Sequence, residues 1–426
     1  MARSGFYGWT VLAALWAVMF LNLGFPAYGP AVINAAMAKT LGLDRETLGN
    51  MFSVYMVMSG LPGPLVAFAV NRIGVRSTLL IGSTLIIAGA LLMATVVSSG
   101  SGAMLGFGLL VGTGVATGGA LASQAGLARW FVRRRALALS ILYSAGAIGG
   151  FVAAPLLNRL IETTGTWRAG WWLLAGLSLL AAVTTLAFVR EHPADVGQFP
   201  DGMAAPAAGM TPASDTRQAF ITRHAWTLGE ALRHPAYWLI LLSLVGGSGG
   251  YTLFLAHGVV HLQDLGHSRT VGAWAVSVLT VTGLGAKGVI ALLGDRFDPR
   301  YLWAVFLAIF GLGLVLVVDA HSRVQVFMFA TCLGIGFGGG IVCIMAVLSN
   351  YYGTAVFASL AGLAVAVNTT LSAIVPKVAG HLYDQGIGYR GTFYFLAAWC
   401  IVGAAVLWFL KPPVPAAGGA AARVGA

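Results

Sequence analysis

The sequence predicts an all-α membrane protein in which twelve transmembrane helices form two pseudo-symmetric six-helix bundles. Three observations lead to this fold class. Hydrophobic residues make up 58% of the 426 residues and charged residues only 9%, which is more apolar than a soluble core can accommodate. Apolar stretches of about 20 residues, the length that crosses a bilayer, recur along the whole chain. Two short basic loops, residues 71–76 and 295–300, each lie between two such stretches, one in each half of the chain.

The predicted spans fall into two sets of six, each span an apolar stretch bounded by polar or turn-forming residues. The spans of the first set cover residues 8–36, 47–70, 77–97, 102–126, 136–158 and 169–189. The spans of the second set cover residues 236–261, 271–293, 301–318, 324–348, 355–381 and 392–410. We expect an N-terminal bundle over residues 1–190 and a C-terminal bundle over residues 235–411. The first span is too long for a signal-peptide core and has no cleavage site after it, so we expect it to be retained.

The only long polar interruption, residues 191–234, separates the two sets of spans. Its first part is rich in Pro, Ala, Gly and Asp and has no apolar periodicity, which predicts a flexible cytoplasmic linker. Its last part predicts a short interfacial helix with Thr227 as the N-cap, leading into the seventh span. Residues 412–426 are predicted to be a disordered cytoplasmic tail.

The basic residues are distributed unevenly between alternate loops, and cytoplasmic loops are the ones that retain Lys and Arg. With the N-terminus inside, fifteen of the 24 Lys and Arg residues lie in inner segments and seven in outer loops. The remaining two, Lys287 and Lys377, fall inside spans. We therefore expect a multi-pass protein of the cell inner membrane with both termini in the cytoplasm. The net charge of +11 reflects this orientation, and we do not expect nucleic-acid binding.

Several classes of function lack their sequence signals. Cys332, Cys343 and Cys400 lie in spans without paired spacing, so we expect packing residues and no disulfide or zinc site. No nucleophile and base constellation or cofactor motif is present, so we expect neither an enzyme nor a cofactor. Most of the 58 glycines are expected to allow close helix packing, and some to permit bending. We expect a monomer in the lipid bilayer.

Two basic loops and two segments that overlap predicted spans resemble a known family. The loops at residues 71–76 and 295–300 resemble the basic loops between spans two and three and between spans eight and nine of the major facilitator superfamily. Residues 129–150 are similar to the start of the fifth helix in its monocarboxylate transporter branch, which includes bacterial and oxalate:formate-like members. Residues 254–266 look like the seventh helix of the bacterial members. The resemblance covers essentially the whole chain.

The resemblance implies rocking between inward-open and outward-open states around a central site. It also implies that the two basic loops act in gating, through Arg72, Arg76, Asp295 and Arg296. Asn71 departs from the pattern, because the family usually has Asp at this position. The first loop therefore lacks the acid of the gating charge pair, whereas the second keeps it.

Lys287 is the most informative single residue, because a cation inside an apolar helix costs at least about 2.5 kcal/mol without a partner, water or an anion. The resemblance places Lys287 where these carriers usually have the eighth-helix arginine that holds the substrate carboxylate. Lysine is a point charge and would orient a carboxylate less strictly than the arginine fork does. The alternative is that Lys287 snorkels to the inner interface, since it lies about two helical turns before Asp295.

Proton coupling needs a titratable group, and no span contains an acid. The resembling carriers use an Asp one turn before the cation, where this chain has Gly283. The remaining candidates are His257 and His261, four residues apart on one helix face; His257 corresponds to a histidine of bacterial relatives. The alternatives are that His257 bonds a neighbouring helix and that His261 marks the outer interface. A histidine pair can also bind a metal, but no third ligand is apparent.

Tyr28, Tyr143 and Asn368 complete the expected substrate-binding residues, with Lys287 and His257, because they lie in helices that face the cavity of the resembling fold. We expect a secondary active transporter for a small monocarboxylate of the lactate or pyruvate kind, coupled to protons by symport. Anion exchange, facilitated diffusion, and export of another organic acid or drug remain alternatives within transport. Metal transport and a non-transporting receptor on the same fold are further alternatives.

Overall fold

The structure, a computed structural model, describes residues 6–132, 134–202, 220, 222, 224–293 and 297–414. All regular structure in these ranges is helical. Eleven of the helical segments found there are long and apolar enough to cross a membrane. The predicted fold class is confirmed.

The first crossing is nearly continuous from Gly8 to Leu41. It consists of α1 (Gly8–Met19), the π-helical η1 (Phe20–Gly24), α2 (Phe25–Tyr28) and α3 (Pro30–Leu41). The chain then turns at Gly42, and Asp44 caps the next helix by accepting a hydrogen bond from the Thr47 amide, at 2.7 Å. The remaining helices of the first half are α4 (Arg45–Gly60), α5 (Gly63–Thr95), α6 (Gly100–Ala103), the π-helical η2 (Met104–Val111), α7 (Gly112–Gly118), α8 (Ala120–Trp130), α9 (Arg135–Thr164) and α10 (Arg168–Phe188).

The second predicted span differs from the structure in two ways. The expected single helix over residues 47–70 is two helices, because α4 ends at Gly60 and α5 begins at Gly63. The expected loop at residues 71–76 is a kink inside α5, centred on Gly74 with φ 90° and ψ 168°, a conformation that glycine adopts without the strain of a side chain. With its 16 residues, α4 is shorter than the eleven long segments, and together with the start of α5 it supplies the twelfth crossing.

The second half follows two short 3-10 helices, η3 (Pro193–Val196) and η4 (Pro200–Gly202). A reciprocal pair of hydrogen bonds between Thr227 and Glu230 begins the short helix α11. The linker between residues 203 and 219 and the tail from residue 415 lie outside the described residues. The helices of this half are α11 (Leu228–Arg233), α12 (Pro235–Leu253), the π-helical η5 (Phe254–Gly258), α13 (Val259–Asp264), α14 (Arg269–Leu293), α15 (Pro299–Val318), α16 (Arg323–Tyr352), α17 (Thr354–Asp384) and α18 (Arg390–Phe409).

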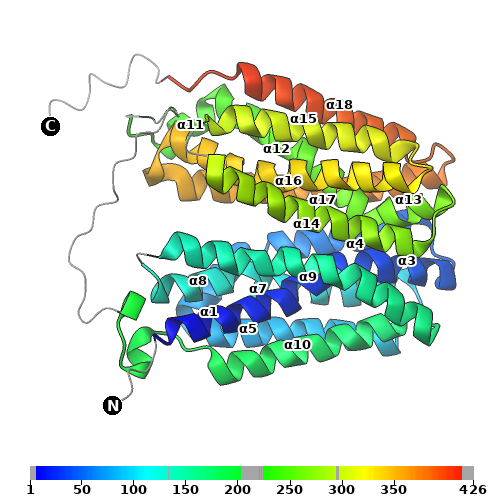
Figure 1. Ribbon diagram of the computed structural model, residues 1–426, viewed down its shortest axis with the longest axis horizontal. Coiled ribbons are helices and arrows are strands. Elements are labelled where there is room, and N and C mark those ends of the chain that lie inside the picture. The colour runs from blue at the N-terminus through cyan, green and yellow to red at the C-terminus, as the bar shows by residue number, and fades with distance from the viewer. Residues whose placement is uncertain are drawn as a thin grey trace.

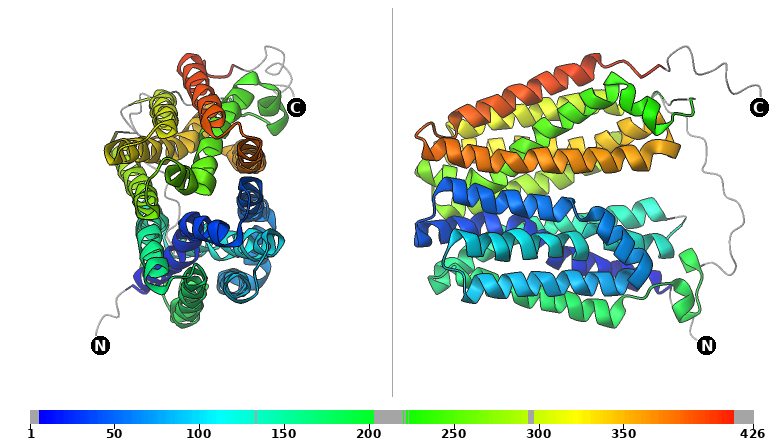
Figure 2. Two further views of the ribbon diagram at one scale, coloured as in Figure 1. Left: turned by 90° about the vertical axis from the view of Figure 1, so that its right-hand side faces the viewer. Right: turned by 180° about the vertical axis from the view of Figure 1, so that it is seen from behind.

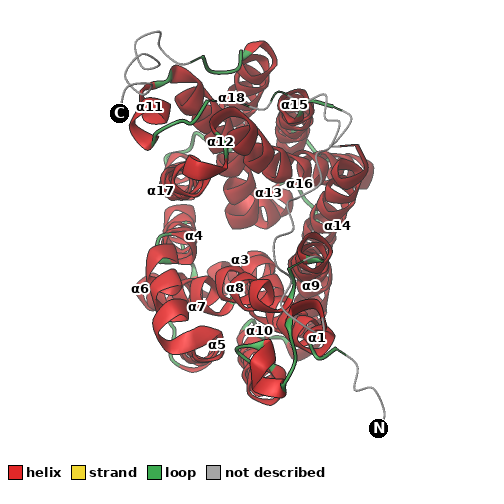
Figure 3. Ribbon diagram, turned by 90° about the vertical axis from the view of Figure 1, so that its left-hand side faces the viewer, coloured by secondary structure: helices red, strands yellow, loops and turns green. Residues whose placement is uncertain are grey.

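The helices up to α10 lie together in the lower part of Figure 1, and those from α11 onward lie in the upper part. The two groups meet along two seams, one where α4 packs against α17 and one where α9 packs against α14 (Figure 3). Seen from behind, α17 and α4 run side by side along most of their length (Figure 2). The space between the seams is where a site shared by both groups can form.

Side-chain burial agrees with a lipid surround. Trp130, Trp171 and Trp303 are fully buried between helices, whereas large apolar side chains such as Phe68 and Phe409 are exposed. A water-soluble protein rarely exposes so many large apolar side chains. In a bilayer these side chains face lipid, and the backbone polar groups are satisfied within the helices.

Candidate functional site

Lys287 of α14 lines a pocket of about 120 Å³ between the two groups of helices. Tyr28, Tyr143, Tyr251 and Phe337 line the same pocket, which we call the cation pocket. Its lysine forms no hydrogen bond or ion pair with any described residue. An unpartnered ammonium group inside a membrane protein requires water or an anion.

The aromatic residues of the cation pocket link the two halves. The Tyr251 hydroxyl donates a hydrogen bond to the Tyr28 hydroxyl across the halves, at 2.9 Å. The Tyr251 ring stacks on Phe337 with ring centroids 3.7 Å apart and planes inclined by 4°. The pocket thus combines one positive charge, tyrosine hydroxyl groups and aromatic faces, which are the groups that recognise a small organic anion.

Close contact between α14 and α16 positions the lysine. Gly283 lies one turn before Lys287, and a Cβ at Gly338 would stand 2.3 Å from the Gly283 carbonyl oxygen. A Cβ at Gly283 itself would stand 3.1 Å from the Gly334 carbonyl oxygen. Gly283 is therefore packed closely against the backbone of α16.

Asn368 lies in a second, larger pocket of about 350 Å³, bounded by α4, α12, α15, α16 and α17. Ser248 and Thr369 also line this pocket, and its lining contains no charged residue and no histidine. We call it the neutral pocket. Tyr251 and Phe337 border both pockets. Of the five predicted substrate-binding residues, Lys287, Tyr28 and Tyr143 are thus brought together and Asn368 lies across an aromatic pair from them.

His257 lines neither pocket and is fully buried in η5. Its Nε2 lies 2.9 Å from the Pro376 carbonyl oxygen and its Nδ1 lies 2.9 Å from the Tyr389 hydroxyl. A carbonyl only accepts hydrogen bonds, so Nε2 carries a proton and, in the neutral ring, Nδ1 accepts from Tyr389. Burial raises the pKa of the Tyr389 hydroxyl, which lies between two spans and keeps its proton. Both nitrogens of a neutral imidazole are satisfied by these partners.

His261 lies beside the same tyrosine. Its Nε2 is 3.0 Å from the Val317 carbonyl oxygen, and its ring packs edge-on against Tyr389. Tyr389 in turn stacks on Tyr383, with centroids 4.5 Å apart. The two predicted proton-coupling histidines therefore meet at Tyr389 and not at the cation pocket. No group of three or more His, Cys, Asp or Glu side chains in the described ranges is arranged to hold a metal ion.

Polar contacts between the halves are concentrated at one end of the molecule, on the right of Figure 1 near α3 and α13, which we call the Arg45 end. Arg45 pairs with Asp264 at 2.8 Å, and Tyr383 donates to the same carboxylate at 2.9 Å. Asp384 accepts hydrogen bonds from the backbone amides of Arg45 and Glu46, at 3.1 and 2.7 Å. A carboxylate of one half thus caps the first turn of α4 in the other, and these contacts close this end.

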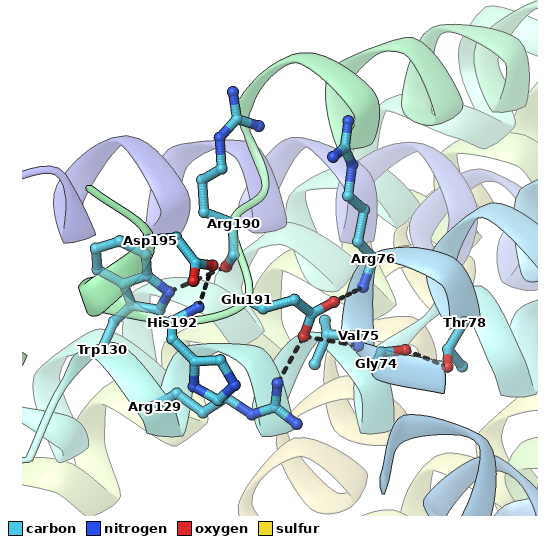
Figure 4. Close-up of polar contacts among 10 residues, drawn as sticks. All are labelled: Gly74, Val75, Arg76, Thr78, Arg129, Trp130, Arg190, Glu191, His192 and Asp195. Carbon is cyan, nitrogen blue, oxygen red and sulfur yellow. Dashed lines mark hydrogen bonds and ion pairs between the residues drawn. The ribbon is translucent and has the colours of Figure 1, made fainter. Parts of the chain in front are cut away.

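The opposite end carries a separate polar cluster within the first half, centred on Glu191 (Figure 4). The Glu191 carboxylate accepts hydrogen bonds from the Val75 and Arg76 amides, at 3.0 and 2.8 Å, and pairs with Arg129 at 2.6 Å. A Cβ at Gly74 would stand 2.6 Å from Glu191 Oε1, so the kink and the carboxylate fit only around glycine. This carboxylate caps the helix segment that begins after the kink.

The predicted gating residues are placed unequally. Arg72 is exposed, whereas the Arg76 guanidinium donates to the Leu186 carbonyl oxygen at 2.6 Å. Asp295 and Arg296 lie outside the described residues. The sequence analysis did not identify Glu191 as a site residue. Its carboxylate lies beside residues 74–76, where the first loop has Asn71 in place of an acid. Its position directly after the sixth span was the available signal, but its partners lie too far away in the chain to be inferred from spacing.

Replacing Glu191 by Gln is expected to lower the melting temperature of the purified protein by a few degrees. The change removes the charge that pairs with Arg129 and weakens a cap, and caps contribute about 0.5–2 kcal/mol. The matched control is Asp319→Asn, because Asp319 pairs with Arg390 through side chains that are 55% and 65% exposed and such pairs contribute little. Equal melting temperatures for the two variants in detergent would contradict the capping role.

Comparisons with known proteins agree with this architecture. The sequence description of the Major Facilitator Superfamily matches residues 14–261 and 256–425. Monocarboxylate transporter 3 of Rattus norvegicus is 27% identical over 403 residues, which cover 92% of this chain and 77% of that protein. The oxalate:formate antiporter of Oxalobacter formigenes is 23% identical over 287 residues, covering 67% of this chain and 64% of that protein. Monocarboxylate transporter 13 of Bos taurus is 25% identical over 285 residues. The match covers 66% of this chain and 62% of that protein's length.

Solved structures share the fold at low sequence identity. A bacterial homologue of the human lysosomal transporter Spinster, in an inward-facing and occupied conformation, superposes with a TM-score of 0.72 at 15% identity. The match covers 95% of this chain and 97% of that one. The D-xylose–proton symporter superposes with a TM-score of 0.69 at 15% identity, covering 95% of this chain and 98% of that one.

Proposed function

The chain belongs to the major facilitator superfamily, and from this premise we propose that it moves a small monocarboxylate across the cell inner membrane as a monomer. The resemblance noted in the sequence is confirmed, and the protein is a multi-pass membrane transporter, not an enzyme. The substrate is an organic anion of the lactate or pyruvate kind. Support for the substrate class comes from relatives named as monocarboxylate transporters and from the chemistry of the cation pocket.

One observation carries the proposal: Lys287 lines a pocket between the two halves without a partner among the residues described. A snorkelling lysine would direct its ammonium group to the interface, whereas this side chain borders the same pocket as Tyr28 and Tyr251. The carboxylate of the substrate would complete the charge balance of the lysine. Tyrosine hydroxyls would supply hydrogen bonds, and the stacked rings of Tyr251 and Phe337 would border the site.

The proposed transport cycle moves the two halves about this pocket. The Arg45 end is closed by ion pairs and caps between the halves. We assign it to the outer side because Arg76, Arg129 and Arg190, which belong to segments predicted to be cytoplasmic, lie in the cluster around Glu191 at the opposite end (Figure 4). Both termini then lie in the cytoplasm, and the structure corresponds to an inward-facing state. Binding drives transport only through its difference between the two states.

We assign proton coupling to His257, which contacts the closed end through its neighbours. The ring of Tyr389 stacks on Tyr383, and the hydroxyl of Tyr383 donates to the Asp264 carboxylate that pairs with Arg45. A proton on His257 Nδ1 would turn the Tyr389 hydroxyl into an acceptor and would place a positive charge beside the ring that stacks on Tyr383. Protonation and opening of the Arg45 end would then favour each other.

Uptake of radiolabelled L-lactate into proteoliposomes tests the coupling. An inward proton gradient is expected to increase initial uptake several-fold in the wild type and to have little effect in His257→Gln. Uptake that ignores the gradient but increases with carboxylate inside the vesicles would replace symport by anion exchange, which the lack of acids in the spans also suits. Flux of neither kind would remove the monocarboxylate assignment.

A further inference from the structure

The neutral pocket is larger than a lactate-sized ion requires. Its volume of about 350 Å³ falls in the range of roughly 300–1,000 Å³ typical of sites for drug-sized ligands. The cation pocket, at about 120 Å³, lies well below that range. A two- or three-carbon acid held at Lys287 would leave the larger pocket unfilled. The two pockets adjoin at Tyr251 and Phe337, which line both.

The lining of the neutral pocket fits an uncharged body with an aromatic ring. Trp303 and Phe310 line it with the Tyr251 and Phe337 rings, and aromatic groups pack favourably against such faces. It contains no charged side chain and no histidine, so a second carboxylate or an ammonium group would be desolvated there without a partner.

The same pocket offers free hydrogen-bonding groups. Asn368 accepts one weak hydrogen bond from Ser372 through Oδ1, at 3.4 Å, and its amide nitrogen has no partner among the described residues. The hydroxyls of Ser248 and Thr369 likewise form no hydrogen bond within the described part of the chain. Other hydroxyls of this lining bond to helix carbonyls, as Thr252 does with Ser372. Free donors and acceptors therefore gather around Asn368.

We propose that the preferred substrate is an extended monocarboxylate whose carboxylate lies at Lys287 and whose neutral, ring-bearing body lies in the neutral pocket. This inference rests on the proposed function, because the carboxylate is held by the same lysine. A polar substituent at the far end of the ring, such as a phenolic hydroxyl, would bond with Asn368. The body passes Tyr251 and Phe337, so the hydrogen bond from Tyr251 to Tyr28 lies beside the bound molecule and joins the two halves around it.

Exchange of labelled acids in proteoliposomes tests the proposal, with lactate, 3-phenyllactate and 4-hydroxyphenyllactate as probes. In the wild type, the two aromatic acids are expected to exchange at least as fast as lactate. Ser248→Leu, which fills the neutral pocket, is expected to lower the ratio of 3-phenyllactate to lactate exchange by about tenfold. Ser359→Leu is the matched control, because Ser359 is an exposed residue of α17 that lines neither pocket.

Asn368→Leu gives a second test, which does not depend on filling the pocket. This variant is expected to lower the ratio of 4-hydroxyphenyllactate to 3-phenyllactate exchange by about tenfold, because the buried phenol loses its partner. Lactate exchange without aromatic exchange in the wild type would overturn the inference and leave the proposed function standing, and so would ratios that neither variant changes. Exchange of none of the three acids by a folded wild-type protein would overturn both.

Discussion

Lys287→Gln is expected to reduce monocarboxylate uptake by about thirtyfold or more. Truncating one partner of a buried, hydrogen-bonded charge pair typically costs about 2–5 kcal/mol of binding free energy, and about 1.4 kcal/mol corresponds to a factor of ten. The lysine has no partner within the described ranges and borders the cation pocket, so the substrate carboxylate is the group that loses its counter-charge. Initial uptake at several substrate concentrations provides the measurement.

The control for this variant is Lys377→Gln, the same change at the second lysine of the spans. Lys377 is an exposed residue of α17 and lines neither pocket, so its loss should leave uptake close to the wild-type rate. Lys287→Arg keeps the charge and is expected to retain part of the activity, with altered preference among acids, because its fork orients a carboxylate more strictly. Equal uptake by the Lys287→Gln and Lys377→Gln variants would contradict an anion site at Lys287.

Gly338→Ala is expected to destabilise the folded protein and to reduce transport, although it adds only one methyl group. The new Cβ would stand 2.3 Å from the Gly283 carbonyl oxygen and 2.5 Å from the Gly283 Cα atom. Overpacking of this kind commonly costs about 1–3 kcal/mol, and the opposing atoms here are backbone, which cannot change rotamer. The helices α14 and α16 would move apart next to Lys287.

The control for the loss of stability is Gly285→Ala, which adds the same methyl group in α14. A Cβ at Gly285 would meet nothing within 4 Å, and in a helix Ala is favoured over Gly by roughly 0.5–1 kcal/mol. The control should therefore be as stable as the wild type or slightly more stable. Melting temperatures in detergent measure both variants, and a Gly338→Ala variant as stable as Gly285→Ala would contradict the backbone contact.

Most of the fold could be predicted from the sequence because bilayer thickness fixes the length of an apolar helix. The spans and their two sets of six followed from that constraint. The break after Gly60 did not, because it depends on local backbone geometry inside an apolar stretch. At residues 71–76 the sequence predicted a loop, but not that the chain would turn through a kink at Gly74 within one helix. At Gly74 the reason lies in a distant residue, since the Glu191 carboxylate occupies the place of a side chain.

Less of the candidate site could be predicted. Lys287, Tyr28 and Tyr143 share one pocket, as expected of residues chosen for charge and polarity inside spans. Asn368 lies instead in the neutral pocket, and the boundary between the pockets is a stacked ring pair in which Phe337 gave no polar signal. We predicted that His257 lines the cavity because it is a titratable residue inside a span. The direction in which its side chain points depends on contacts with residues distant in the sequence, such as Tyr389.

Equilibrium exchange tests the central claim most directly, because it depends on neither the proton gradient nor the direction of transport. Proteoliposomes loaded with an unlabelled monocarboxylate would be diluted into the labelled acid, with wild-type protein and with the Lys287→Gln and Lys377→Gln variants. If Lys287 holds the substrate carboxylate, the label should enter rapidly with the wild type and the Lys377 variant. With the Lys287 variant it should enter only at the rate of protein-free vesicles. Label entry that is equally fast in all three proteins, or absent from all three, would contradict the account.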